Sequence, residues 1–356
     1  MDDPYTSGDL PDDLPQNYLA SLPFLPNQFY SELPLPRAME ALSLLMCTVL
    51  TSDGSLNRGQ KGMLLRGVGA LLRNDVCALY FRQAPPAKSP QDRQLLKFGL
   101  KLAKLGPRIS IHDIESLRQA GLDDGVILEA AITTAIGRMF CTLADGLVPP
   151  PELQAQLADA AKLPDSPDPV GSSGPYLNSE SSLPDDFPPY QFFREQFGFV
   201  PNIFCAQALR PGLLEIEAKV LDMVLLGQDL LSRVQKEKIL LAVSARNLNT
   251  YFVAVHSEIL KGLGVSLDES GQIVSDYRSA ILSDADKCLL DFACGLANSD
   301  RRKVDAHGLT SYGFTKLQII EGIAISALTN FLNTVQFGLG AVPDFPPRRV
   351  FSPQDL

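Results

Sequence analysis

A glutamate and a histidine in the second half of the chain have the residue types and spacing for proton transfer. Glu237 lies in the segment KEKILLAVSARNL, and His256 closes the segment NTYFVAVH that follows it. Both segments have helical patterns, so the two side chains would meet if the helices pack antiparallel about a turn near 247–249. A carboxylate beside an imidazole fixes the tautomer of the ring and provides a general base or acid near neutral pH. The residues alone leave two interpretations open, a catalytic pair or a core histidine near a solvated glutamate.

Two further residues share a helix face with this histidine. Asn249 and Phe252 precede His256 at spacings that place all three on one side of a helix. Asn249 suits an N-cap, because its side-chain oxygen can accept a backbone N–H of the helix that follows. Phe252 would make a pocket beside the histidine apolar, which suits a hydrophobic or aromatic molecule. We expect both to line this pocket; the alternative is that His256 is a core residue and Glu237 part of a solvated face.

Two asparagines interrupt a long apolar segment near the end of the chain. Asn330 and Asn333 lie in TKLQIIEGIAISALTNFLNTVQFGL. Buried amides need hydrogen-bond partners. The two residues are predicted to line the pocket, or else to bond a facing helix or a second subunit.

Composition limits the classes of function. The chain has 356 residues, 45% of them hydrophobic and 20% charged, and a net charge of −10. These values are typical of a folded globular protein, and the negative charge argues against a nucleic-acid partner. The acidic start lacks the apolar core of a secretory signal, and we identify no apolar run near the ~20 residues that cross a bilayer. We expect a cytoplasmic protein.

Cysteine and histidine usage argues against a metal centre. Six cysteines include no C-x-x-C pair, and three histidines are too few for a histidine-rich site. Most of the cysteines lie in apolar helical patterns, so buried reduced thiols are the simpler interpretation. We expect neither a metal nor a cofactor.

The chain contains an internal repeat. Its matches include LPDD at 10–13 and 183–186, FLPNQF and FVPNIF at 24–29 and 199–204, Leu56-x-Arg58-x-Gln60-Lys61 and Leu231-x-Arg233-x-Gln235-Lys236, and Gly146–Leu147 and Gly338–Leu339. Matches at proline, glycine and asparagine mark backbone requirements, which generic core residues do not. The repeat predicts two homologous units, 10–150 and 183–345, joined by a linker at 151–182 that is rich in Pro, Ser and Asp.

Both units have helical patterns throughout. Segments that open with proline carry apolar residues at three-to-four spacing, and each unit ends in a long, nearly all-apolar segment. We find no persuasive alternating strand pattern. The sequence therefore predicts an all-α fold of two tandem helical bundles packed as a pseudo-dimer.

The chain resembles the AhpD-like superfamily, the alkylhydroperoxidase D and carboxymuconolactone decarboxylase group, over most of both units. The resemblance is carried by GFVPNIF, by the helix that begins KEKILLAVSA and by the histidine that closes YFVAVH, and it is closest to the peroxidase-related branch. In the redox members, the positions of Asn249 and Phe252 are cysteines. Glu237 and His256 match the family motif, and both thiols are replaced.

The first unit departs from the family motif differently. Its matching positions are Gly62, Asn74, Cys77 and Phe81, so one thiol remains without the acid or the histidine. A thiol attacks a peroxide as its thiolate, and a second cysteine then resolves the product as a disulfide. Cys77 is thus a possible redox thiol without a resolving partner, or an inert buried residue.

The resemblance implies three hypotheses of function. The first is acid–base chemistry by Glu237 and His256 on a small apolar or aromatic molecule, as in the decarboxylase branch. The second is a thiol-dependent peroxidase that uses Cys77, and the third is a non-catalytic scaffold or ligand-binding protein. Because single units of the family often form trimers or hexamers, we also expect self-association.

Overall fold

A computed structural model describes residues 37–51, 54–147, 175–177, 183–227, 230–298 and 305–345. Within these ranges the chain forms helices and no strand, which confirms the all-α prediction. The predicted linker at 151–182 lies outside the described residues except for 175–177, and so do residues 10–36 of the predicted first unit.

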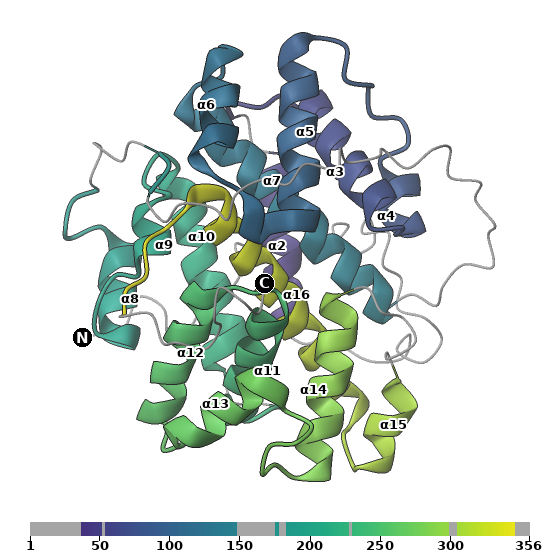
Figure 1. Cartoon of the computed structure of the whole chain (residues 1–356), viewed down its shortest axis with the longest axis vertical. Coiled ribbons are helices and arrows are strands. Elements are labelled where there is room, and N and C mark those ends of the chain that lie inside the picture. The colour runs from purple at the N-terminus through teal and green to yellow at the C-terminus, as the bar shows by residue number, and fades with distance from the viewer. Residues whose placement is uncertain are drawn as a thin grey trace.

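The first half contributes six α-helices and one 3₁₀ turn to the described chain. They are α2 (Arg37–Thr51), α3 (Arg58–Leu71), α4 (Asp75–Tyr80), α5 (Pro90–Leu105), η1 (Gly106–Arg108), α6 (Ile111–Gln119) and α7 (Asp124–Leu147). Figure 1 shows α3 to α6 gathered at one end of the molecule.

The second half repeats this order with one additional helix, α13, and its α8 and α9 match positions outside the described residues. Its elements are α8 (Pro188–Phe197), α9 (Asn202–Cys205), α10 (Pro211–Leu221), the π-helical turn η2 (Asp222–Leu226), α11 (Arg233–Arg246), α12 (Thr250–Gly262), α13 (Leu267–Asp276), α14 (Asp284–Ala297), α15 (Ala306–Ser311) and α16 (Lys316–Leu339). Between α4 and α5, where α13 would correspond, the first half has only turns and extended chain. The additional helix α13 therefore explains why the matching residues Lys61 and Lys236 are 175 positions apart, whereas Gly146 and Gly338, later in each half, are 192 apart.

Local contacts recur at matching positions. Asn74 caps α4 by accepting the backbone N–H of Cys77, and Asn249 caps α12 in the same way. The residue before each cap, Arg73 or Leu248, has a left-handed φ of 54° or 58°. Such a conformation is uncommon for a side chain larger than glycine, so the same sharp turn is built twice.

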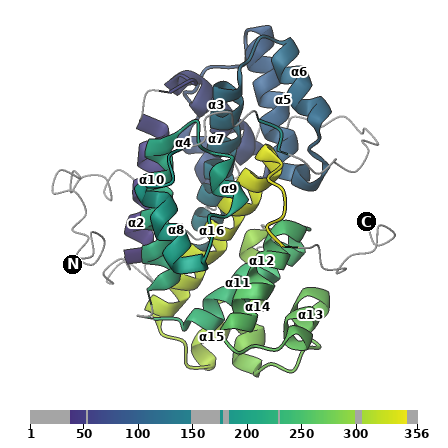
Figure 2. The ribbon, with the colours of Figure 1, turned by 90° about the vertical axis from the view of Figure 1, so that its left-hand side faces the viewer.

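The two long apolar helices meet at the centre of the molecule. α7 and α16 pack along each other, and Figure 2 shows α16 running diagonally from one set of helices to the other. Glycine makes the approach close: a Cβ at Gly146 would lie 2.7 Å from Ile323, and one at Gly338 would lie 2.8 Å from Ala131. α7 is apolar and long enough to span a membrane by composition, but 89% of its most apolar window is buried in the protein.

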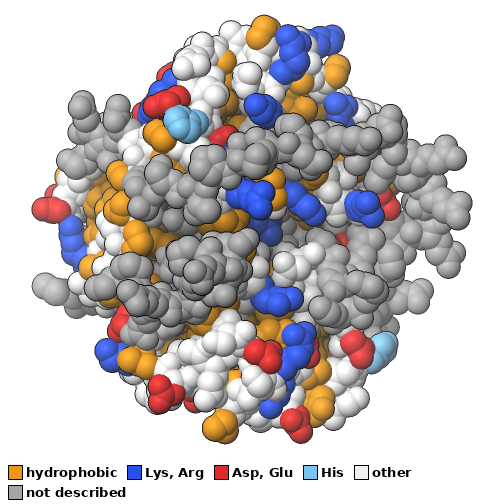
Figure 3. All heavy atoms as spheres, viewed as in Figure 1, with side chains coloured by type: hydrophobic (Ala, Val, Ile, Leu, Met, Phe, Trp, Pro, Cys, Tyr) orange, Lys and Arg blue, Asp and Glu red, His pale blue; other side chains and the backbone are white. Residues whose placement is uncertain are grey.

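The surface carries both signs of charge. On the face shown in Figure 3, acidic and basic side chains both occur over the described surface, with hydrophobic groups between them. Although the net charge of the chain is −10, this face of the molecule is not purely acidic.

One buried acid makes stability depend on pH. Glu217 on α10 is 2% exposed, and its Oε2 accepts a hydrogen bond from Gln207 Nε2 at 3.0 Å. Its Oε1 has no hydrogen-bond partner among the described residues. Burial raises the pKa of Glu217 from 4.5 to about 8, opposed by the bond from Gln207. The folded protein therefore holds this proton more tightly than the unfolded chain.

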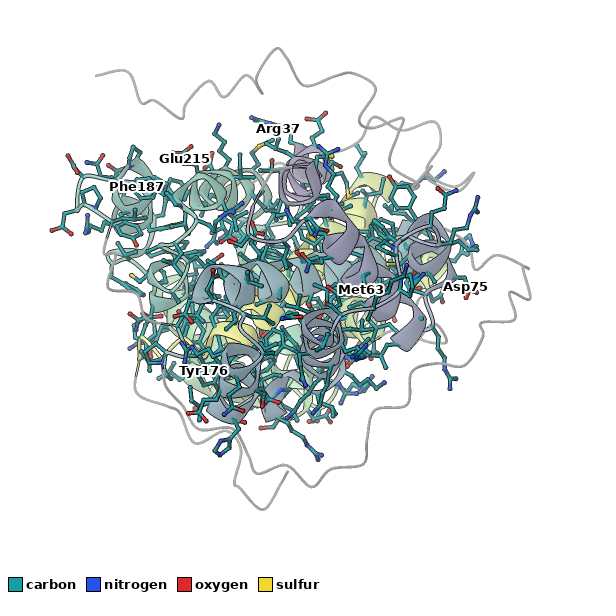
Figure 4. The ribbon with its side chains drawn as sticks, turned by 90° about the horizontal axis from the view of Figure 1, so that it is seen from above. Arg37, Met63, Asp75, Tyr176, Phe187 and Glu215 are labelled. Carbon is teal, nitrogen blue, oxygen red and sulfur yellow. The ribbon has the colours of Figure 1, made fainter. Side chains whose placement is uncertain are left out.

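Glu217→Gln should remove this pH dependence. Between pH 4.5 and 8 the folded state binds more protons than the unfolded state, so the wild-type free energy of unfolding falls as pH rises. Relative to wild type, the variant should gain on the order of 3 kcal/mol between pH 5 and 8.5. Urea unfolding at both pH values measures this, with Glu215→Gln on the exposed side of α10 as the matched control (Figure 4). A difference between Glu217→Gln and wild type that is equal at both pH values would contradict the assignment.

Candidate active site

The helical pair α11 and α12 brings the predicted catalytic residues together. The helices are joined by only three residues, 247–249, and pack against each other. His256 Nδ1 lies 2.7 Å from Glu237 Oε2, and the two residues are 4% and 0% exposed. An ionised carboxylate can only accept a hydrogen bond. The ring proton is therefore on Nδ1 of His256, and Nδ1 donates a hydrogen bond to Glu237. In the neutral ring, Nε2 then holds a lone pair.

Arg233 joins this pair. Its Nη2 lies 2.6 Å from Glu237 Oε1, one helical turn away on α11. The carboxylate therefore faces a guanidinium on one oxygen and an imidazole on the other, which compensates its complete burial. Arg233 was not among the site residues predicted from the sequence, although its position four residues before Glu237 on the same predicted helix face indicates such a contact.

Arg233, Glu237 and His256 lie in the wall of a cavity of about 520 Å³. Its other walls are mainly apolar and include the aromatic residues Phe197, Phe199, Phe204, Tyr251, Phe252 and Phe345. The ring of Phe252 stacks on that of His256, with centroids 5.5 Å apart and planes 15° from parallel. Phe252 thus lines the predicted pocket, and the volume suits a small organic molecule.

Three buried polar atoms of the residues that line the cavity have no hydrogen-bond partner within the described part of the chain: His256 Nε2, Arg233 Nη1 and Glu237 Oε1. Glu237 Oε1 is nevertheless held in the ion pair with Arg233. Buried polar atoms in native proteins are usually paired with protein or water. His256 Nε2 and Arg233 Nη1 are therefore the two of these atoms beside the cavity that have neither a hydrogen bond nor an ion-pair contact.

The segment after α16 closes one side of the cavity. Tyr251 donates a short hydrogen bond to Asp344, which also accepts from the backbone N–H of Asn202 at 2.9 Å. Burial raises the pKa of both Tyr251 and Asp344. Phe345 then packs edge-on against Phe199 at 5.4 Å. No sequence pattern marked this closure, because its partners are distant along the chain.

The structure does not bring the predicted asparagines to this cavity. Asn249 is the N-cap of α12, and its Nδ2 donates to Gln336 Oε1 at 2.9 Å. Asn333 donates to Ser244 Oγ at 3.1 Å, which joins α16 to α11. The amides of Asn249 and Asn333 are used in helix capping and helix pairing. Neither residue lines the cavity at His256, whose walls are mainly apolar and aromatic side chains.

Asn330 also has a structural position. Its Nδ2 donates to Thr142 Oγ1 and to Ala297 O at 2.9 Å each, and its Oδ1 accepts from Arg138 and Asn247. It thereby ties α16 to α7, α14 and the turn after α11. These contacts match the prediction that Asn330 forms hydrogen bonds with a facing helix.

The matching location in the first half is built differently. Gly62 occupies the position that matches Glu237. A Cβ at Gly62 would lie 3.0 Å from the Cβ of Ala84, so the side chain of Ala84 packs against this glycine. Phe81, at the histidine position, packs against Tyr80 and Phe140. Neither Gly62 nor Phe81 has a side chain that can transfer a proton.

Cys77 is enclosed in the core. It is 0% exposed, and its Sγ lies 3.4 Å from the carbonyl oxygen of Leu65. Burial, and then a hydrogen bond with Cys77, raises the pKa of the neighbouring Cys141 thiol. A peroxide cannot reach a sulfur that is enclosed in this way, and attack on a peroxide requires that contact.

Cys77 should resist alkylation in the native protein. Because its thiol is enclosed, modification by iodoacetamide requires local opening, and we expect a rate about 100-fold below that of the unfolded chain. Peptide mass spectrometry after timed labelling measures this, with Cys141 as a second enclosed thiol and Cys288, which is partly exposed, as the comparison. Labelling of all three in guanidinium chloride is the positive control. Rapid native labelling of Cys77 would restore it as a redox candidate.

Comparison with known proteins gives matches among solved structures. No family model matches the chain, and no curated protein matches it. An uncharacterized peroxidase-related protein from Silicibacter sp. TM1040 is 24% identical, with a TM-score of 0.43 over 47% of this chain and 88% of that one. An uncharacterized peroxidase-related protein with an alkylhydroperoxidase AhpD core, from Ralstonia eutropha JMP134, is 27% identical, with a TM-score of 0.43 over 46% and 87%. Both are described as peroxidase-related, and the second as having an AhpD core.

Proposed function

We propose that the protein is an acid–base enzyme that acts on a small apolar or aromatic molecule bound in the 520 Å³ cavity. The observation that carries this proposal is the unused Nε2 of His256 in the wall of that cavity, with its other ring nitrogen held by Glu237 at 2.7 Å. His256 is the base, and Glu237 is the residue that positions it. The cytoplasmic location and the self-association expected from the sequence remain predictions.

The tautomer determines the direction of proton transfer. Glu237 accepts from Nδ1, so Nε2 of the neutral ring can take a proton from a bound molecule. The imidazolium that forms is stabilised by the adjacent carboxylate and can return its proton to another atom of the same molecule. Removal and return of one proton amount to an isomerisation and need no net oxidant or reductant.

Arg233 adds a second requirement for the substrate. If the base removes a proton from a carbon beside a carbonyl group, the electron pair of that C–H bond forms a carbon–carbon double bond, and the π pair of the carbonyl moves to its oxygen to give an enolate. Arg233 Nη1, which is otherwise unused, can donate to this oxygen as its charge develops. The proposed substrates are therefore carbonyl compounds with an apolar or aromatic body.

The two alternatives explain fewer observations. A peroxidase based on Cys77 would need access to a thiol that is 0% exposed. A non-catalytic binding protein would use the cavity, but that function does not explain why Arg233, Glu237 and His256 are buried together. Burying charges is costly, so a purely packing role for all three is the weaker explanation.

Proton exchange tests the proposal without knowledge of the natural substrate. Phenylacetone in deuterated buffer exchanges the hydrogens beside its carbonyl, and proton NMR follows the rate. We expect the wild-type protein to accelerate this exchange and His256→Gln to lose about 10²–10⁴-fold of the acceleration. Glu237→Gln should lose about 10²-fold, because an amide can donate to Nδ1 and thereby favour the other tautomer.

The controls separate the three functions. Cys77→Ser should leave the exchange rate unchanged, and wild type should not turn over cumene hydroperoxide. Exchange at equal rates in wild type and His256→Gln would refute the acid–base proposal. Hydroperoxide turnover that Cys77→Ser abolishes would favour the peroxidase instead.

A further inference from the structure

A small cavity lies where the long helices of the two halves meet. Its volume is about 110 Å³, and it shares no lining residue with the cavity at His256. Helices α5 and α7 of the first half line it together with α14 and α16 of the second half. Among the described residues that form its wall there is no carboxylate.

The two halves contribute matching residues to this cavity, but only the first half contributes charge. Arg138 on α7 matches Asn330 on α16, at the separation of 192 positions that relates these two helices. Lys104 and Asn298 occupy the same position relative to the serines that cap α5 and α14. The wall therefore carries two cations from the first half and two neutral amides from the second.

Arg138 has no counter-ion in the part of the chain that the structure describes. Each of the arginines that line the other two cavities pairs with a carboxylate, Glu237 or Glu129. Nη2 of Arg138 instead donates to the neutral amide oxygen of Asn330 at 3.2 Å. Its Nε is enclosed and has no acceptor among the described residues. The hydrogen-bonding capacity of this guanidinium is thus only partly used by the protein.

The charge of Arg138 is held at a cost. Burial lowers the pKa of Arg138 from 12.5 to about 10, and a Coulombic interaction with Cys141 opposes this shift. The guanidinium is still protonated at neutral pH. A charge withdrawn from water without a counter-ion carries a free-energy cost, which a bound anion would reduce. Lys104 is exposed, so its flexible side chain can bring a second positive charge to such an anion.

We propose that this cavity binds a phosphate group between Arg138 and Lys104. The phosphate oxygens accept charge-assisted hydrogen bonds from the terminal nitrogens of the guanidinium and from the ammonium group. The cavity equals about four water volumes, whereas pockets for whole organic ligands begin near about 300 Å³. The ligand is therefore inorganic phosphate, or the phosphate end of a molecule whose remaining atoms lie in solvent.

Phosphate titration of the full-length protein at constant ionic strength tests this site. Methyl NMR shifts of Leu72 and Ala297 report on it, because both residues line this cavity and neither lines the other two. We expect saturable shifts with a dissociation constant of about 1 mM. Sodium chloride at the same ionic strength should not reproduce them, because chloride cannot bridge the two cations as the several oxygens of phosphate do.

Glycerol 3-phosphate distinguishes the two sources of the phosphate group. Tighter binding than that of inorganic phosphate assigns the site to an organic phosphate, and equal or weaker binding assigns it to the free ion. Saturable shifts with either molecule support the site. His256→Gln should leave the shifts unchanged, so the outcome is independent of the proposed enzymatic activity.

Lys104→Gln and Lys97→Gln form one matched pair of variants. Both remove an exposed positive charge from α5, but only Lys104 lines the cavity. Lys104→Gln should weaken phosphate binding about threefold to tenfold, and Lys97→Gln should leave it within about twofold. Because both positions are exposed, neither change threatens the fold.

Arg138→Gln and Arg66→Gln form the second pair. Both arginines are partly buried and donate to a neutral acceptor, Asn330 or the carbonyl of Ala84, but only Arg138 lines the cavity. Arg138→Gln should weaken phosphate binding at least about tenfold, and Arg66→Gln should leave it within about twofold.

Three results would overturn the proposal. They are the absence of saturable shifts at Leu72 and Ala297 up to 100 mM of either phosphate compound (roughly one hundred times the expected constant), the same shifts with sodium chloride, and equal effects of Lys104→Gln and Lys97→Gln on binding.

Discussion

The close packing of α7 against α16 is the constraint on which the other contacts depend. Gly146 and Gly338 allow each helix to approach its neighbour to a distance that a Cβ would prevent. Helices α2, α3, α5, α11 and α14 pack directly against this central pair (Figure 2). α12, which carries His256, packs against α11, so the position of the active-site pair depends on the central helices through α11.

Buried charge is distributed over this frame in matched sets. Lys236 is paired with Glu321, and Glu129 with Arg210, so that these two buried carboxylates each face a cation, whereas the buried Glu217 is bonded by Gln207. Such pairs contribute little net stability, since desolvation offsets their attraction, but removal of one partner is costly. The buried cations and carboxylates therefore specify how the helices meet more than they strengthen the fold.

The proposed active site has the same arrangement with one difference. Glu237 is held by Arg233 and His256, yet each of these residues keeps one polar atom unused in the cavity wall. The first half has Gly62 and Phe81 at the corresponding positions. A scaffold that occurs twice thus supports proton-transfer groups only once, while the contacts that shape the turn at Asn74 and Asn249 are present in both halves.

The sequence alone determined the helices, their repeated order and the pairing of Glu237 with His256. These features depend on hydrophobic period, capping residues and the length of one short turn, which act within a few residues along the chain. The hydrogen-bond partners of Asn330 and Asn333 and the closure of the cavity by Tyr251 and Asp344 were decided only by the tertiary structure. Each depends on a partner, or on space left, between segments distant in sequence. The way in which the packed helices cross determines which distant segments meet, and no local sequence pattern predicts that crossing.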